Sequence, residues 1–157
     1  MVLYEGIFFE GDSSKLIVLN EGRALEKKVS NFHCTFKFRP KDEEIFDEIV
    51  GEDVNVMVIG YGCDGKNSGY EVVLPGFIQK YYLNYDKNNP NKLATSHITI
   101  SLAKGARAVD TKNLEFSPLY KPFVLRGRFG YFISEGKEQY VSYDKYFKSN
   151  VKKLVKK

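Results

Sequence analysis

One short pattern occurs twice in this chain, and it constrains both the fold and the candidate site. The sequence contains two histidines, His33 and His97. Each is followed at the second position by a threonine, Thr35 or Thr99, and at the third by a hydrophobic residue. Apolar side chains occupy the alternate positions, which is typical of half-buried β-strands. Each motif is therefore predicted to lie on a strand that turns one polar face and one apolar face to its surroundings.

Other segments rich in aromatic and β-branched residues recur between turn signals. Strands are predicted at 3–9, 32–38, 54–61, 70–74, 97–102, 123–133 and 139–143. Helices are predicted at 15–20 and 42–50, and residues 77–85 fit either a helix or a strand, with the helix preferred. Many strands with few short helices predict an α+β fold. We expect one domain over residues 1–144, followed by a Lys-rich tail or helix over 145–157.

The charge distribution limits the partners of the protein. The net charge is +4, but six lysines and no acidic residue lie between 145 and 157. Without these lysines the chain has 18 basic and 20 acidic residues, so its body is not a broad basic surface for nucleic acid. The tail is expected to be a solvated terminal helix, and attraction to a polyanion is the alternative.

Nothing in the sequence indicates export or membrane insertion. The N-terminus has no basic leader, and no stretch approaches the roughly 18 apolar residues of a membrane span. Cys34 and Cys63 lack the spacing of a zinc site or a redox pair. We expect a cytoplasmic monomer with reduced thiols, no membrane partner, no bound metal and no cofactor.

The paired motifs carry the residue types that phosphodiester chemistry needs. A neutral imidazole can take a proton from the attacking oxygen while a second, protonated imidazole donates one to the leaving oxygen. Threonine hydroxyls can donate hydrogen bonds to the non-bridging phosphate oxygens, and these bonds strengthen as charge develops. His33 and His97 are therefore the candidate acid–base pair, and Thr35 and Thr99 the candidate phosphate ligands. No metal is required for this chemistry.

At these motifs the chain resembles the two-histidine phosphoesterase superfamily, the LigT-like cyclic phosphodiesterases, which is defined by two His-x-Thr/Ser-hydrophobic motifs. The resemblance covers roughly residues 3–133. It implies a bilobal α+β fold in which two pseudo-symmetric sheets each bring one motif strand to a central cleft. It also implies a nucleotide or RNA-end substrate: a 2′,3′-cyclic phosphate, a cyclic nucleotide signal or a 2′–5′ linkage. Ser96 precedes the second motif where many members have proline, so the subfamily and the substrate stay open.

Four further residues are predicted to bind the substrate. Lys37 and Arg39 follow the first motif on its His/Thr side, where they would neutralise a second phosphate or the leaving nucleotide; a solvated strand end is the alternative. Ser101 shares the predicted face of His97 and would add a hydroxyl. Tyr61 would stack on a base, or else pack as a core or rim aromatic.

Two alternatives to an enzyme are compatible with the sequence. The same cleft could hold a nucleotide or RNA without turning it over, as a binding module. The protein could also be a structural or interaction protein in which the two motifs coincide by chance. Arg126 and Arg128 leave a similar choice, because they suit either phosphate contacts or the polar side of a half-exposed strand.

Overall fold

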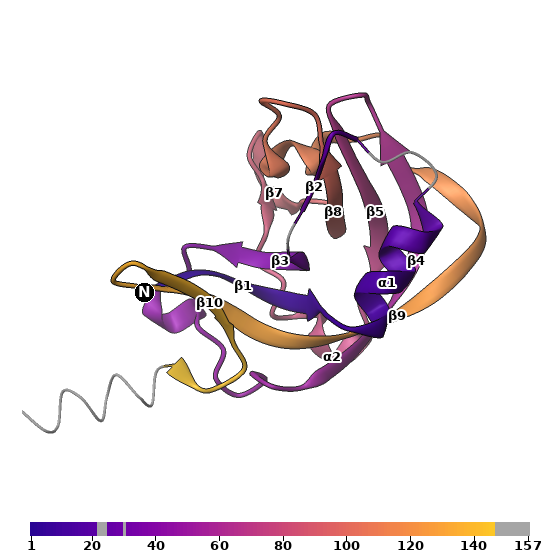
Figure 1. Cartoon of the computed structure of the whole chain (residues 1–157). Helices are drawn as coiled ribbons and strands as arrows, with labels where there is room; N and C mark the ends of the chain where they lie inside the picture. Colours follow the sequence, from indigo (N-terminus) through magenta and orange to yellow (C-terminus); the bar gives the residue numbers. More distant parts are fainter. Residues whose placement is uncertain (22–24, 30, 147–157) are drawn as a thin grey trace, which may run out of the picture.

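A computed structural model describes residues 1–21, 25–29 and 31–146 of the chain (Figure 1). Apart from its first two residues, the tail predicted over 145–157 lies outside the described residues. No helix in the described residues is long and apolar enough to cross a membrane.

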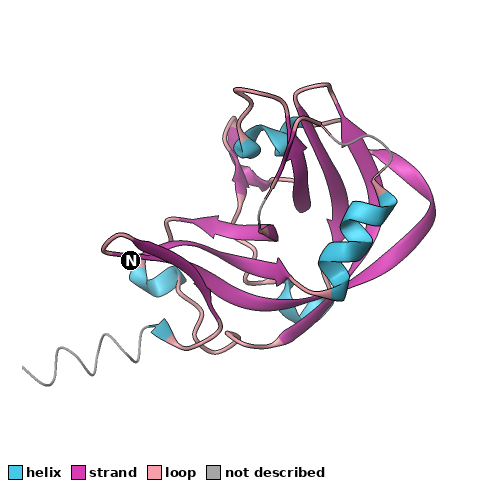
Figure 2. Ribbon diagram, in the orientation of Figure 1, coloured by secondary structure: helices cyan, strands magenta, loops and turns pink. Residues whose placement is uncertain are grey.

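Most of the described chain forms one curled, antiparallel sheet, as Figure 2 shows. Its strand order is β2-β8-β5-β4-β9-β1-β3, and β10 pairs with β9 beside this path. The strands are β1 (Val2–Phe9), β2 (Lys27–Lys28), β3 (Phe32–Phe38), β4 (Asp53–Cys63), β5 (Asn67–Val73), β8 (His97–Leu102), β9 (Ser117–Glu135) and β10 (Glu138–Ser142). Strands β6 (Tyr85–Asp86) and β7 (Asn89–Leu93) form a separate hairpin. All seven predicted strands are confirmed, with bounds that differ by a few residues.

Helical structure is sparse. The helices are α1 (Asp12–Asn20), α2 (Gly76–Gln79) and two 3₁₀ turns, η1 (Asp42–Glu44) and η2 (Ala108–Asn113). The helix predicted at 15–20 is confirmed, and the one preferred at 77–85 is reduced to α2. The helix predicted at 42–50 is wrong beyond η1. Its residues make long-range contacts instead: the Phe46 backbone N–H donates to the Glu5 carboxyl, and the Asp47 side-chain carboxyl accepts from the Tyr131 hydroxyl.

The curl of the sheet brings its two motif strands together. Strand β9 pairs with β4 along its first part and with β1 along its second, so it joins the two halves of the sheet. Strands β3 and β8 then contact each other across the concave side (Figure 1). The hydrophobic core is formed by residues from both halves of the sheet. Its largest fully buried side chains include Phe36, Phe129 and Tyr131.

The structure confirms a mixed fold made mostly of strands with few helices. The two separate sheets that were expected are joined here into one continuous sheet, because β9 runs through both halves. Each motif strand nevertheless belongs to a different half: β3 is paired to β1, and β8 to β5.

Candidate active site

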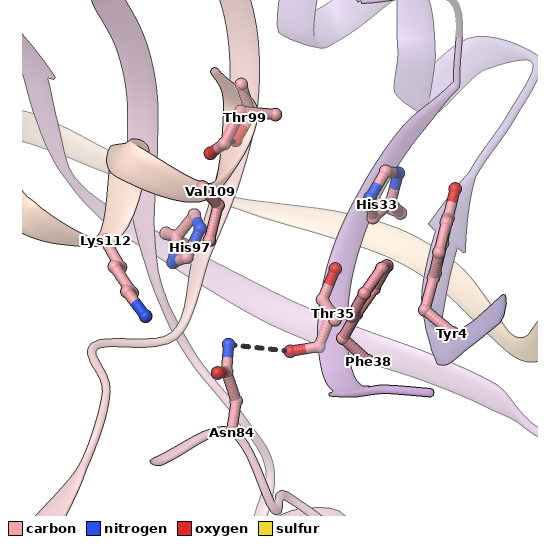
Figure 3. Close-up of a pocket in the computed structure, with 10 residues that line it drawn as sticks. Tyr4, His33, Thr35, Phe38, Asn84, His97, Thr99, Val109 and Lys112 are labelled. Carbon is pink, nitrogen blue, oxygen red and sulfur yellow. Dashed lines mark hydrogen bonds between the residues drawn. The ribbon is translucent and has the colours of Figure 1, made fainter. Parts of the chain in front are cut away.

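Both motifs line a single cavity of about 290 Å³ (Figure 3). Its polar wall is formed by His33, Thr35, Asn84, His97, Thr99 and Lys112, and its apolar wall by Tyr4, Phe38, Ala108 and Val109. The four residues that define the motifs are thus brought together, although 61 residues or more of sequence separate one pair from the other. Strand β3 holds His33 and Thr35 on one side, and β8 holds His97 and Thr99 on the facing side.

The two imidazoles are held in the same way. His33 Nδ1 lies 2.8 Å from the carbonyl oxygen of Asn31, and His97 Nδ1 lies 2.8 Å from that of Thr95. Because a carbonyl can only accept, each Nδ1 carries the hydrogen. In the neutral ring the proton acceptor is then Nε2. Both histidines therefore have the tautomer that a general base at Nε2 requires.

The neighbours of the two rings differ. The His33 ring is stacked on Tyr4, with 4.6 Å between ring centroids, and Phe8 lies 5.7 Å away. His97 instead lies near the cationic Lys112, and this charge contributes to lowering the pKa of His97.

Burial makes both imidazoles harder to protonate. The pKa of His33 is lowered to about 4: burial is the main cause, the hydrogen bond to Asn31 opposes the shift, and a positive charge on His97 adds to it. Burial also lowers the pKa of His97; the hydrogen bond to Thr95 opposes this shift, and Lys112 adds to it. Both imidazoles are therefore expected to be neutral at neutral pH when no anion is bound beside them.

Each motif threonine lies opposite a glycine on the neighbouring strand. Gly6 of β1 is paired with Thr35, and Gly69 of β5 with Thr99. A Cβ at Gly6 would collide with the carbonyl oxygen of Cys34, and one at Gly69 would lie 2.8 Å from that of Ile98. Both glycines thus permit the same close approach, to the residue just before the threonine.

The register around the two glycines is also repeated. In both strand pairs, the residue two positions after the glycine pairs with the motif histidine. The residue just before the glycine pairs with the residue two positions after the threonine. The register shift leaves Phe36 in β3 and Ile100 in β8 without a partner on that side. Their carbonyls accept backbone N–H bonds from Leu83 and Val29 instead, both at 3.0 Å. Two segments without obvious sequence similarity beyond the motif therefore build the same local structure.

These register shifts turn two of the predicted substrate contacts away from the cavity. A bulge interrupts the alternation of side chains, so the residue after it leaves the face on which simple counting places it. Lys37 pairs with buried Glu5, and its Nζ lies 3.8 Å from the Glu44 carboxylate. Ser101 is fully buried and bonded to Ser68. Neither residue lines the cavity.

The other two predicted contacts also lie outside the cavity lining. Arg39 has its guanidinium 5.5 Å from the centre of the Phe38 ring. Tyr61 packs against Tyr70 in the core, with 5.7 Å between ring centroids, so the alternative of a packing aromatic describes it better.

Thr35 and Thr99 differ in how their groups are bonded. Thr35 is half-buried, and its carbonyl accepts the Asn84 side-chain N–H at 3.5 Å. Thr99 is buried, and its hydroxyl donates to the Thr111 hydroxyl at 2.9 Å. Thr111 is itself held by Asn67, so η2 is tied to the second motif through buried hydrogen bonds.

Sequence reasoning missed six residues of the cavity: Tyr4, Phe38, Asn84, Ala108, Val109 and Lys112. They carry no local signal, because five of them come from segments outside the two motif strands. Tyr4 and Phe38 could have been found only from the pairing of β1 with β3, which places them opposite each other. Lys112 supplies the one positive side chain that lines the cavity within the described part of the chain.

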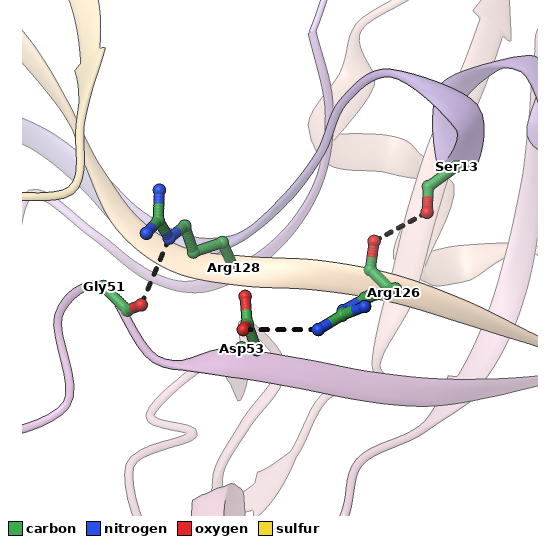
Figure 4. Close-up of polar contacts among 5 residues, drawn as sticks. All are labelled: Ser13, Gly51, Asp53, Arg126 and Arg128. Carbon is green, nitrogen blue, oxygen red and sulfur yellow. Dashed lines mark hydrogen bonds and ion pairs between the residues drawn. The ribbon is translucent and has the colours of Figure 1, made fainter.

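Arg126 and Arg128 lie apart from this cavity, on β9 (Figure 4). Arg126 is 3.5 Å from the Asp53 carboxylate, and both side chains are largely exposed. Arg128 Nε donates to the Gly51 carbonyl at 3.1 Å, and its guanidinium lies over the Tyr143 ring. These arginines fit the alternative in which they form the polar side of a half-exposed strand.

Comparison with known proteins does not place the chain in a family. No protein-family model matches it, and no curated protein is significantly similar to it. The case for its function therefore rests on the residues of the cavity.

Proposed function

We propose that this protein is a metal-independent phosphodiesterase of the two-histidine type, acting on a cyclic phosphate, a 2′–5′ linked nucleotide or an RNA end. The observation that carries the proposal is the duplicated site: two histidines with the same fixed tautomer and two glycine-paired threonines line one cavity. A chance coincidence of two His-x-Thr segments would not be expected to repeat the histidine hydrogen bond, the glycine and the register shift. We infer that the two halves of the curled sheet correspond to the two lobes of that superfamily.

The proposed reaction uses one imidazole on each side of the phosphorus. A water oxygen attacks phosphorus while Nε2 of the neutral histidine takes its proton. The bond from phosphorus to the ester oxygen breaks, and Nε2–H of the other, protonated histidine supplies the proton that this oxygen requires. The product is a phosphomonoester when the substrate is a cyclic phosphate. Which histidine is the base depends on how the substrate lies between β3 and β8.

The remaining polar groups suit the charge of a phosphodiester. Thr35 and Thr99 line the cavity together with the imidazoles, and the Lys112 ammonium opposes the negative charge that builds up during attack. The Thr35 hydroxyl can donate to the phosphate, whereas the Thr99 hydroxyl would first have to leave its hydrogen bond to Thr111. A bound phosphate anion also favours protonation of one histidine, which offsets the burial that lowers its pKa.

A substrate panel in EDTA tests the proposal. The purified protein is incubated with 2′,3′-cyclic mononucleotides, 2′–5′ linked oligoadenylate and cyclic dinucleotides, with His33→Ala and His97→Ala as controls. Turnover in EDTA that both substitutions abolish is the expected result, and the preferred panel member identifies the substrate class. A folded protein that turns over no member contradicts the proposal and favours the binding module.

Substitution of Lys112 is expected to change both the rate and the pH profile. Lys112→Met should lower turnover at least about tenfold, because it removes a charge that opposes the phosphoryl charge. The same loss should raise the pKa of His97, since the ammonium disfavours its protonated form. The limb of the kcat/KM profile that depends on His97 should therefore move to higher pH.

The kcat/KM of the wild type is itself expected to be highest below pH 6.5, because burial lowers the pKa of both histidines.

Lys112→Arg is the matched control, since it keeps the positive charge. It should retain the wild-type pH limb and most of the activity. If Lys112→Met has the rate and the profile of the wild type, Lys112 has no part in the reaction.

A further inference from the structure

The cavity has an apolar wall that acid–base chemistry on a phosphate does not require. Two large hydrophobic side chains of this wall are exposed: Phe38 at 61% and Val109 at 47%. They lie on opposite sides of the cavity, Phe38 next to Thr35 and Val109 next to His97 (Figure 3). Apolar surface left open beside a few convergent polar groups is typical of a site for a small organic ligand.

The position of Phe38 depends on the bulge in β3. Regular alternation would place Lys37 on the cavity face, where a cation would suit a phosphate. The register shift at Gly6 instead pairs Phe38 with Tyr4 on that face and turns Lys37 toward Glu5 and Glu44. The local structure therefore exchanges a charged side chain for an aromatic ring at the edge of the cavity.

Arg39 adds a second, independent observation on the same ring. It is the one non-glycine residue with a positive φ in the described chain, at 50°. This left-handed conformation is unfavourable for a residue with a Cβ, and such strain tends to persist at functional positions. Its backbone N–H donates to the Leu3 carbonyl at 2.7 Å, and its guanidinium lies 5.5 Å from the Phe38 ring centre. Arg39 thereby supports the ring by a cation–π contact.

The opposite wall is anchored to the phosphate-binding side. Val109 belongs to η2, whose buried Thr111 accepts hydrogen bonds from Thr99 and Asn67. The apolar side chain is therefore held at a defined place relative to the second motif. A planar group attached to a phosphate at the histidines would meet Phe38 on one side and Val109 on the other.

We propose that Phe38 and Val109 form a clamp for a nucleobase, so that the cavity takes a nucleotide in preference to a phosphodiester without a base. This inference rests on the proposed function, whose reacting phosphate it places between His33 and His97. A volume of about 290 Å³ lies just below the roughly 300–1,000 Å³ of small-ligand sites, which suits a ligand no larger than one nucleotide unit. Stacking on an aromatic ring accepts any base, so the clamp recognises the presence of a base more than its identity.

The test compares a nucleotide with its base-free counterpart. kcat/KM is measured for adenosine 2′,3′-cyclic phosphate and for methyl ribofuranoside 2′,3′-cyclic phosphate, with wild type, Phe38→Ala, Phe38→Tyr and Val109→Ala. Phe38→Ala is expected to lower the value for the nucleotide on the order of 10- to 100-fold and to change that for the base-free substrate less than about threefold. Val109→Ala should act in the same direction, and Phe38→Tyr should retain the preference. Phe77→Ala is the matched control, because Phe77 is 55% exposed and does not line the cavity.

The outcomes separate the clamp from the reaction. Equal wild-type activity on both substrates, or an equal loss on both in Phe38→Ala, overturns the clamp and leaves the phosphodiesterase standing. If the wild type turns over neither substrate, the proposed function fails on that class, and the clamp is tested by equilibrium binding of 3′-AMP and ribose 3-phosphate. A preference for 3′-AMP that Phe38→Ala removes then supports the clamp, and equal affinities overturn it.

Discussion

Replacement of His97 by asparagine is expected to lower kcat by about 10²–10⁴-fold, the usual contribution of a positioned acid or base. The asparagine side chain can keep an N–H near the position of Nδ1, which donates to the Thr95 carbonyl at 2.8 Å in the wild type. What it lacks is the ring nitrogen Nε2, which we propose exchanges the proton. The protein should therefore stay folded and keep most of its affinity for a nucleotide while it loses turnover.

His33→Asn should behave alike, because His33 has the same hydrogen bond to its own backbone segment. If the two imidazoles act in one step, the double variant should lose little more than either single variant. Steady-state kinetics of the three variants, with urea unfolding to confirm their stability, checks this expectation. A single variant that keeps more than a tenth of wild-type turnover would remove that histidine from the mechanism.

Glu5→Gln is expected to stabilise the protein at pH 8 by a few kcal/mol, and to do so far less at pH 4.5. Glu5 is fully buried, and its Oε2 has no hydrogen-bond partner among the described residues. Burial raises its pKa to about 8; the Phe46 N–H at 3.4 Å opposes the shift, and the nearby carboxyl groups of Glu44 and Asp47 add to it. The folded protein therefore keeps this proton at neutral pH.

The sign follows from proton linkage. Below the unfolded pKa of about 4.5 both states hold the proton, so Glu5 has no pH-dependent effect. Between that value and about 8 the unfolded chain releases the proton and the folded chain retains it. Wild-type stability then falls by up to about 1.4 kcal/mol per pH unit from this group. Glutamine does not ionise, so the advantage of the variant should grow with pH over this window.

Urea unfolding of both proteins at pH 4.5, 6 and 8 measures this difference. Glu52→Gln is the control, because its side chain is exposed and the substitution removes the same charge. A stability difference between Glu5→Gln and wild type that stays constant from pH 4.5 to 8 would show that the Glu5 carboxyl does not bind its proton as the structure implies.

The position of Lys37, near the Glu5 carboxyl, is one feature that could not be predicted from the sequence. Regular alternation of side chains along the strand places Lys37 on the His33 face. The register shift at Gly6 turns it instead toward Glu5 and Glu44, where it lowers the pKa of Glu5. A bulge is a property of a strand pair, so one strand's sequence does not reveal it. The corresponding register shift at Gly69 likewise turns Ser101 away from the face on which regular alternation places it.

The sequence by itself determined the strands and the candidate acid–base pair. Alternation of polar and apolar side chains is a local property, and it marked β3 and β8 and the faces of His33, Thr35, His97 and Thr99 correctly. Only the tertiary structure decided that both faces line one cavity, because the curl of the sheet depends on how β9 pairs with β4 and β1. The same long-range pairing decided which other side chains enter the cavity. Four other side chains reach the cavity through contacts between segments that are distant in the sequence: Phe38, Asn84, Val109 and Lys112. No local sequence pattern predicts such contacts.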